Sequence, residues 1–143
     1  MAKAKHQVKL HSYGIYNKWD SDAKALPQVS QFTTQVEAEI DVEFGLIINI
    51  KKAKGMKLRY CIYHPNIPDE DGEVMAPFDG EEYIRSNDWD FYLGDTIWAP
   101  ISNKLGTWRM TIELAGEIIA EKSFELYQES PGDPAQFFRK RGM

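Results

Sequence analysis

Cysteine, net basic charge and long apolar runs are all scarce in this 143-residue sequence, and each shortage excludes a class of protein. Cys61 stands alone, so no internal disulfide can form, and a reducing compartment is the simpler location. The net charge of −5 argues against a general nucleic-acid binder, which needs a basic surface to displace counterions from phosphates. The longest strongly apolar run, residues 44–50, is far shorter than the ~20 residues of a membrane-spanning helix.

The N-terminal residues 1–7 carry charge, but no apolar run follows them. As given they are therefore not a signal peptide, although a trimmed sequence could hide one. From these shortages we expect a soluble, cytoplasmic protein that binds no nucleic acid and has no membrane span. The length is that of one domain with one core.

Catalytic motifs are missing as well. The sequence has no Gly-x-Ser-x-Gly elbow, no Gly-x-Gly-x-x-Gly turn and no P-loop. His6, His11 and His64 lack the spacing that places two imidazoles on one metal ion, and Cys61 with His64 supplies only two zinc ligands. We therefore predict a protein that is not an enzyme and has no metal or cofactor. Catalysis by Cys61 beside a histidine base stays open as an alternative, because periodicity places Cys61 on a polar strand face.

Strand periodicity is what the sequence does have, and it is clearest in residues 105–127. Apolar and polar residues alternate from Trp108 to Leu114, and Ala115-Gly116 then reverses the chain. Glycine accepts the positive φ that short hairpin loops demand, so this stretch predicts a β-hairpin. The returning apolar row consists of Ile118, Ala120, Phe124 and Leu126.

The upstream sequence supplies strands for a second layer. Alternation over residues 36–50 exceeds the usual strand of about 5 to 6 residues, so we expect a bend or bulge at residues 41–45 that carries the chain between sheets. Residues 8–17 are typical of a first strand, in which Gly14 marks a bulge or a close approach of another backbone. Residues 18–31 predict a loop. The other predicted strands are residues 56–62, 73–77, 82–86, 89–93 and 96–99.

Residues 69–95 contain ten acidic residues and one basic residue, which gives them a charge of −9. An acidic run is most often a solvated strand edge that prevents edge-to-edge pairing. Aromatic rings interleaved with the acids can instead stack on a sugar or a peptide, and paired carboxylates are also what a glycosidase needs. The predicted ligand face consists of Tyr83, Trp89, Phe91, Tyr92 and Trp98.

Within the acidic run, Asp69-Glu70-Asp71-Gly72 has the oxygen density of a calcium loop. The EF-hand pattern needs a glutamate at position 80, where this sequence has Gly80. We therefore expect a solvated turn, with a weak surface calcium site as the alternative.

Residues 128–143 carry two prolines and two glycines without strand periodicity, so we predict a mobile tail outside a sandwich domain of residues 1–127. Disorder is the simplest interpretation of this composition. The alternative is docking on a partner groove, an acidic surface or an anionic membrane. Docking on the acidic run of a second copy would give a homodimer. The docking residues would be Phe137, Phe138, Arg139, Lys140 and Arg141.

Five short motifs resemble those of a small bacterial family of uncharacterised domains, catalogued as a domain of unknown function. They are Ser12-Tyr13-Gly14-Ile15-Tyr16, Phe44-Gly45, His64-Pro65, Gly106-Thr107-Trp108 and Glu121-Lys122-Ser123-Phe124-Glu125-Leu126. The similarity spans about residues 8–127 and leaves the tail outside. It implies an immunoglobulin-like sandwich, and it implies no activity, cofactor or catalytic residue.

Independently of the resemblance, strands with turn signals every dozen or so residues predict an all-β fold. We expect an immunoglobulin-like antiparallel β-sandwich that acts as a non-catalytic module for an unidentified protein or small ligand. The alternative is an enzyme or accessory domain that acts on carbohydrate or peptide through the acidic aromatic face, residues 69–98.

Overall fold

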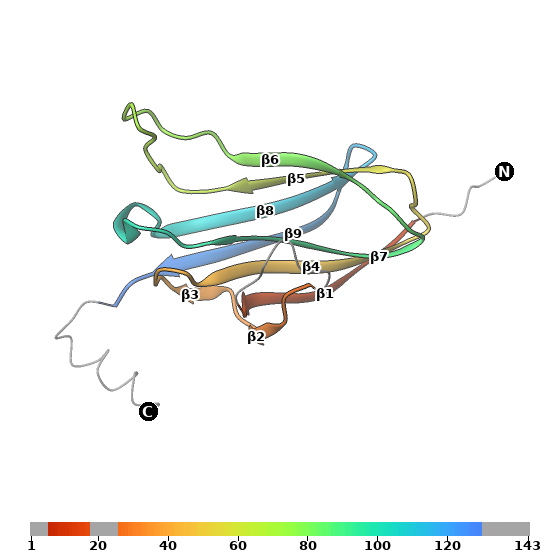
Figure 1. Ribbon diagram of the computed structural model, residues 1–143, viewed down its shortest axis with the longest axis horizontal. Coiled ribbons are helices and arrows are strands. Elements are labelled where there is room, and N and C mark those ends of the chain that lie inside the picture. Colours follow the sequence, from red (N-terminus) through yellow and green to blue (C-terminus); the bar gives the residue numbers. More distant parts are fainter. Residues whose placement is uncertain (1–5, 18–25, 130–143) are drawn as a thin grey trace.

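Nine strands in two sheets make up most of residues 6–17 and 26–129, which are the residues that the computed structural model describes. The elements are β1 (Gln7–Tyr16), β2 (Val29–Gln31), β3 (Gln35–Glu37), β4 (Glu43–Lys51), β5 (Lys57–Tyr63), β6 (Phe78–Tyr83), β7 (Asp88–Thr96), the 3-10 turn η1 (Ile101–Asn103), β8 (Gly106–Leu114) and β9 (Glu117–Tyr127). One sheet has the order β2-β1-β4-β7 and the other β3-β9-β8-β5-β6 (Figure 1). The predicted sandwich is confirmed, although β3 and β9 pair in parallel and the sheets are therefore not wholly antiparallel.

The hairpin β8–β9 forms where the sequence predicts it. Trp108, Met110 and other alternate residues of β8 are buried, and both turn residues, Ala115 and Gly116, have positive φ. The expected inward row of β9 is wrong at Ile118, which is 50% exposed. The β8–β9 pairing shifts by one residue next to Ile112, because Ile112 pairs with Ala120 and Glu113 pairs with Ile118. The side chains at the start of β9 therefore point to the other face of the sheet.

The long alternating stretch of residues 36–50 divides as expected into two strands. β3 belongs to the five-stranded sheet and β4 to the four-stranded sheet, so the chain changes sheets between them. Asp41, with a φ of 72°, makes the turn. Ile40 lies in this turn and is 54% exposed, so the alternation of the sequence does not correspond to a buried face there.

Gly14 in β1 marks a close approach of another backbone, as predicted. Its φ is 130°, and a Cβ atom there would lie 2.0 Å from the carbonyl oxygen of Gln31. The approaching segment is β2, so the loop predicted for residues 18–31 is wrong at Val29–Gln31. Residues 18–25 of that loop lie outside the described residues.

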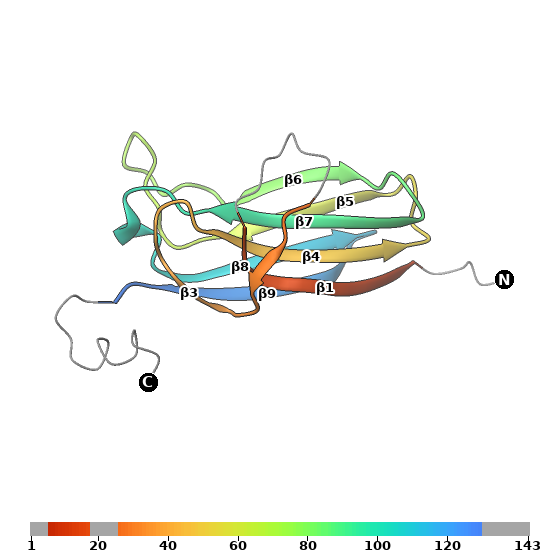
Figure 2. The same cartoon turned by 60° about the horizontal axis from the view of Figure 1, so that its bottom comes forward.

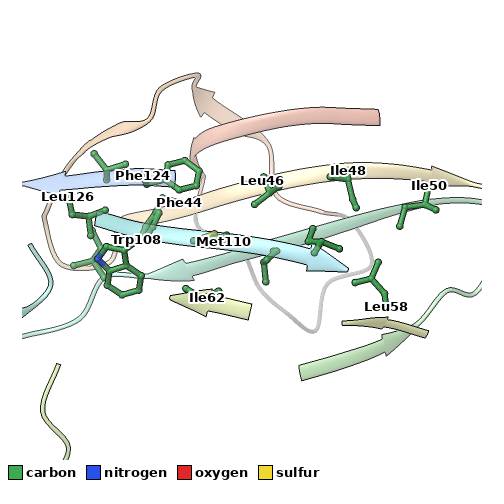
Figure 3. Close-up of a cluster of buried hydrophobic side chains, with 14 of the residues drawn as sticks. Phe44, Leu46, Ile48, Ile50, Leu58, Ile62, Trp108, Met110, Phe124 and Leu126 are labelled. Carbon is green, nitrogen blue, oxygen red and sulfur yellow. The ribbon is translucent and has the colours of Figure 1, made fainter. Parts of the chain in front are cut away.

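The core lies between the sheets and is built from alternate residues of the central strands. Phe44 of β4 packs edge-on against Trp108 of β8 and Phe124 of β9, with ring centroids 5.3 and 5.5 Å apart (Figure 3). The Nε1–H group of Trp108 donates a hydrogen bond of 2.8 Å to the carbonyl oxygen of Lys104. This buried ring therefore has its polar atom satisfied.

The middle third departs most from the predicted strands. Residues 73–77 form only an isolated bridge at Val74, because prolines interrupt the segment between β5 and β6 and cannot donate to a ladder. Residues 82–86 and 96–99 likewise are not separate strands, whereas β7 extends beyond the predicted 89–93. Ile84 is buried and donates its N–H to the carbonyl oxygen of Met56, and the chain then passes from β6 in one sheet to β7 in the other.

No described helix is both long and apolar enough to cross a membrane.

Candidate functional site

A groove of about 530 Å³ opens between β6 and β7, which are edge strands of opposite sheets and run along the same side of the molecule (Figure 2). Each has a paired neighbour on one side only among the described strands. We call this hollow the β6–β7 groove. Its lining residues are Tyr60, Ile62, Phe78, Asp79, Glu82, Phe91, Tyr92, Leu93, Gly94, Asp95 and Trp98.

Strand alternation directs the rings of the groove towards one another. Tyr60 of β5 and Phe91 of β7 face each other across the sandwich with ring centroids 5.8 Å apart. Trp89, two residues before Phe91 on the same face, stacks on it at 5.5 Å and an interplanar angle of 24°. Two strands, β5 and β7, thus contribute one aromatic surface.

Gly80 leaves the space that the phenol of Tyr60 occupies. The two residues are directly paired across β5 and β6, and a Cβ atom on Gly80 would lie 2.3 Å from the Tyr60 hydroxyl. Any side chain at position 80 therefore displaces this ring. The shape of the groove depends on a glycine that needs no unusual φ.

The end of the groove at Phe78 is closed by packed rings. Trp98 lies 6.2 Å from Phe78, measured between ring centroids. On its other side the buried Lys104 places its Nζ atom 4.2 Å from the Trp98 centroid and donates to the carbonyl oxygen of Pro100. Burial lowers the pKa of Lys104. The cation fixes Trp98 in place by a cation–π contact.

Three carboxylates line the groove in different environments. Asp79 is exposed at the rim, and Glu82 is half-buried with the guanidinium of Arg85 3.4 Å away. Asp95 lies deeper, and burial raises its pKa to about 6, although the N–H of Thr96 donates to its Oδ1 atom at 2.8 Å and lowers the pKa. A carboxyl group with this pKa can hold or release a proton close to neutral pH.

The edges of β6 and β7 add backbone groups to these side chains. Alternate N–H and C=O groups of an edge strand point away from its neighbour and are free to pair with another chain. β7 is nine residues long, which is ample for such pairing. The groove therefore combines rings, carboxylates and strand edges, a set that suits an extended ligand.

Three of the five residues of the predicted ligand face, Phe91, Tyr92 and Trp98, line the groove. Trp89 stands behind Phe91. Tyr83 lies elsewhere: it is 60% exposed on the opposite face of β6, with the Nζ atom of Lys57 5.4 Å from its ring. The structure thus brings Trp89, Phe91 and Trp98 to the groove and leaves out Tyr83 and the ring of Tyr92.

The ring of Tyr92 points to the outer face of its sheet. It packs edge-on against Tyr16 at 5.1 Å, and its hydroxyl donates to the buried carboxylate of Glu43. Thr96 donates to the same carboxylate. Burial, followed by the charge of Glu43, raises the pKa of Tyr92. This cluster joins β1, β4 and β7 and gives β7 a firm support behind the groove.

Cys61 and His64 do not have the geometry of a catalytic nucleophile and its base. Both ring nitrogens of His64 lie near backbone carbonyl oxygens, Nδ1 2.6 Å from that of Pro65 and Nε2 2.9 Å from that of Ala76. Neither is directed at Cys61 as a base would be. Burial raises the pKa of the Cys61 thiol, which disfavours the nucleophilic thiolate.

The acidic turn at residues 69–73 is explained by its own backbone. The Oδ1 atom of Asp69 accepts hydrogen bonds from the N–H groups of Asp71 at 2.8 Å and Glu73 at 3.0 Å. Within residues 6–17 and 26–129, no three His, Cys, Asp or Glu side chains gather as a metal site requires. The predicted tail residues Phe137 to Arg141 lie outside the described residues.

Sequence reasoning missed the contribution of β5 and β6 to the site. The sequence predicts a strand over residues 56–62, which contains Tyr60, and Phe78 lies in the acidic run, but neither pattern indicates a groove between them. The pairing of a tyrosine with a glycine, Tyr60 with Gly80, could have indicated that the Tyr60 ring lies in the groove. The register of β5 and β6 must be known before this pair can be recognised.

Comparison with known proteins agrees with this fold. The sequence model of a family described as a domain of unknown function (DUF3859) matches residues 4–126. The structure is similar to that of an immunoglobulin-like protein from Pseudomonas aeruginosa, with a TM-score of 0.67 and 21% identity over 85% of this chain and 97% of that chain. The expected immunoglobulin-like sandwich is thereby confirmed.

A second similarity is to the Pseudomonas fluorescens alkylpurine DNA glycosylase AlkC bound to DNA containing an abasic site analog. Its TM-score is 0.42, with 12% identity over 83% of this chain and 30% of that chain, which is too low to indicate a shared fold. No curated protein matches this chain.

Proposed function

We propose, from the premise that the chain belongs to the DUF3859 family of domains of unknown function, that it is a non-catalytic binding module whose ligand lies in the β6–β7 groove. The observation that carries the proposal is the groove itself. Its volume of about 530 Å³ falls within the range of about 300–1,000 Å³ typical of ligand sites. Aromatic walls with a few polar groups are the usual composition of such sites.

The geometry favours a long, narrow ligand. The groove runs between two strands that have no second neighbour among the described strands, so a bound chain gains backbone hydrogen bonds along β6 or β7 and ring contacts with Tyr60, Phe91 and Trp98. An extended peptide of a partner protein meets both requirements. A sugar chain would use the rings and carboxylates and leave the strand edges unused.

The test compares two neighbouring substitutions. Gly80→Ala displaces the Tyr60 ring, whereas Glu81→Ala changes the outward face of the same strand. The intact chain and both variants are immobilised and exposed to lysate of the parent organism, and then to panels of oligopeptides and oligosaccharides. We expect a saturable ligand that the intact chain and Glu81→Ala retain and Gly80→Ala loses. A ligand retained equally by Gly80→Ala would contradict the groove as the site, and the lack of any saturable ligand would contradict the module.

A second candidate function rests on Asp95. A partly buried carboxyl with its pKa raised to about 6, sharing a groove with Asp79 and Glu82, has the character of a general acid for cleavage of a glycoside or peptide. Nitrophenyl glycosides and chromogenic peptides test this directly. Turnover that disappears in Asp95→Asn would replace the non-catalytic proposal by an enzyme.

A further inference from the structure

We propose that the occupant of the β6–β7 groove is the segment of residues 137–141 from a second copy of this chain. The inference rests on the proposed function and names its partner. It pairs the β6–β7 groove with residues 137–141, a segment rich in basic and aromatic residues.

Charge complementarity is the first reason. Residues 69–95, which contain β6 and β7, carry a charge of −9, and no described Lys or Arg lines the groove. Residues 137–141 carry three basic residues and no acidic one. Opposite charges on the two surfaces bring them together and disfavour acidic competitors.

The two adjacent phenylalanines of the segment are the second reason. In an extended chain successive side chains point to opposite faces. One phenylalanine ring would therefore enter the aromatic wall formed by Tyr60, Phe91 and Trp98, and alternate basic side chains would reach the carboxylates of Asp79 and Glu82. The edge of β7 that faces away from β4, beside which no other described strand lies, would supply the backbone pairing in the manner of strand addition.

The geometry of the sandwich decides between the same copy and another. β9 is separated from β6 by β8 and β5, so the lateral distance is three strand spacings, or about 14 Å. The ladders place Phe78 at the level of Lys122, five residues before the end of β9, which adds about 17 Å along the strands. Combining the two gives a straight span of about 22 Å before the chain turns over the β6 edge into the groove.

The connecting chain is short for this span. Nine residues lie between Tyr127 and position 137, and a flexible chain of about that length has an r.m.s. end-to-end distance of about 17 Å. Docking within one copy would therefore hold the connection beyond its average span, which lowers the effective concentration of the segment at its own groove. A reciprocal dimer, in which each segment enters the groove of the other copy, avoids this cost.

Sedimentation velocity on the full chain over a range of concentrations tests the proposal. Two variants each weaken one side of the contact: R139E/K140E/R141E reverses the charge of the segment, and D79N/E82Q neutralises the two carboxylates that its basic side chains would reach. The matched control E70Q/E117Q removes the same amount of charge from exposed positions that do not line the groove. We expect a dimer whose Kd rises at least tenfold in both test variants and stays unchanged in the control. Mixing the segment variant with D79K/E82K should restore a dimer, because the reversed charges then match.

Each other result overturns the proposal in a distinguishable way. A monomer at all concentrations excludes the second copy, and faster hydrogen exchange of β7 amides in the segment variant would then show docking within one copy. A dimer unaffected by either variant would lie at another surface. If the dimer fails but a peptide or sugar still binds in a manner sensitive to Gly80→Ala, the binding module stands and only its occupant changes.

Discussion

Replacing Asp95 by asparagine should stabilise the fold at neutral pH. The ionised carboxylate is unfavourable where it lies, since burial raises its pKa from the ordinary 3.8 to about 6. Asparagine has nearly the same shape and keeps an oxygen for the N–H of Thr96, which donates to Asp95 at 2.8 Å. The substitution therefore removes a charge without removing the acceptor.

The size of the effect follows from the two pKa values. They differ by about two, and each whole pKa unit corresponds to about 1.4 kcal/mol, so the ionised group costs at most about 3 kcal/mol. Water that enters the groove screens the charge, which brings the expected gain to about 1–3 kcal/mol.

The dependence on pH has a definite sign. The folded state binds the Asp95 proton more tightly than the unfolded chain does, so this stabilisation is complete below about pH 3.8 and is lost as the pH rises through about 6. The difference between Asp95→Asn and the natural chain should therefore be small at pH 4 and largest above pH 7.

Urea unfolding at pH 4, 5.5 and 7.5 measures this difference directly. Asp71→Asn, in the exposed turn between β5 and β6, serves as the control and should change stability by less than about 0.5 kcal/mol at each pH. A variant that is less stable than the natural chain at pH 7.5, or equally shifted at all three values, would refute the reasoning. A charge retained at this cost is typical of a functional site.

Three further substitutions test the framework behind the groove by urea unfolding with an unchanged m-value. Gly45→Ala places a Cβ atom 2.2 Å from the carbonyl oxygen of Leu93 and should cost about 2 kcal/mol or more by forcing β4 and β7 apart; a neutral result would contradict the close approach. Glu43→Ala removes the carboxylate that accepts two buried hydroxyl groups and should cost about 2–4 kcal/mol, while Glu43→Gln should cost less. Trp108→Phe leaves the carbonyl of Lys104 without its 2.8 Å donor and should cost about 1–3 kcal/mol; an unchanged midpoint would show that the indole hydrogen bond contributes nothing.

The sequence predicts those parts of the fold in which a strand shows a clear pattern and its neighbour in the fold is also its neighbour in the sequence. The hairpin β8–β9 joins neighbours in sequence, so its alternation and its Ala115-Gly116 turn suffice to find it. The passage from β3 to β4 is also predictable, because the alternating stretch of residues 36–50 is too long to be a single strand. These features need no knowledge of distant residues.

Prediction fails where a distant partner decides the structure. β2 has three residues and exists because it pairs with β1, which no local pattern records. The acidic stretch conceals β6 and the full length of β7, because charged side chains on edge strands weaken the alternation that identifies a strand.

The groove was within reach of the sequence only in part. Its rings Phe91 and Trp98 stand out by composition, and so does the surrounding acidity. Tyr60 joins them only through its pairing with Gly80, and the raised pKa of Asp95 arises from burial between the sheets. Both are properties of packing, which a single sequence does not specify.

The placement of the outer ends of β1 and β9 has a mechanical consequence. β1 begins at one end of the sandwich and β9 finishes at the other, and the two lie in different sheets (Figure 1). Tension applied between these ends would pull along the strands, across hydrogen bonds that lie perpendicular to them. The β1–β4 and β8–β9 ladders would then bear the load in shear, with many bonds strained at once, and would not open one bond at a time as in a zipper.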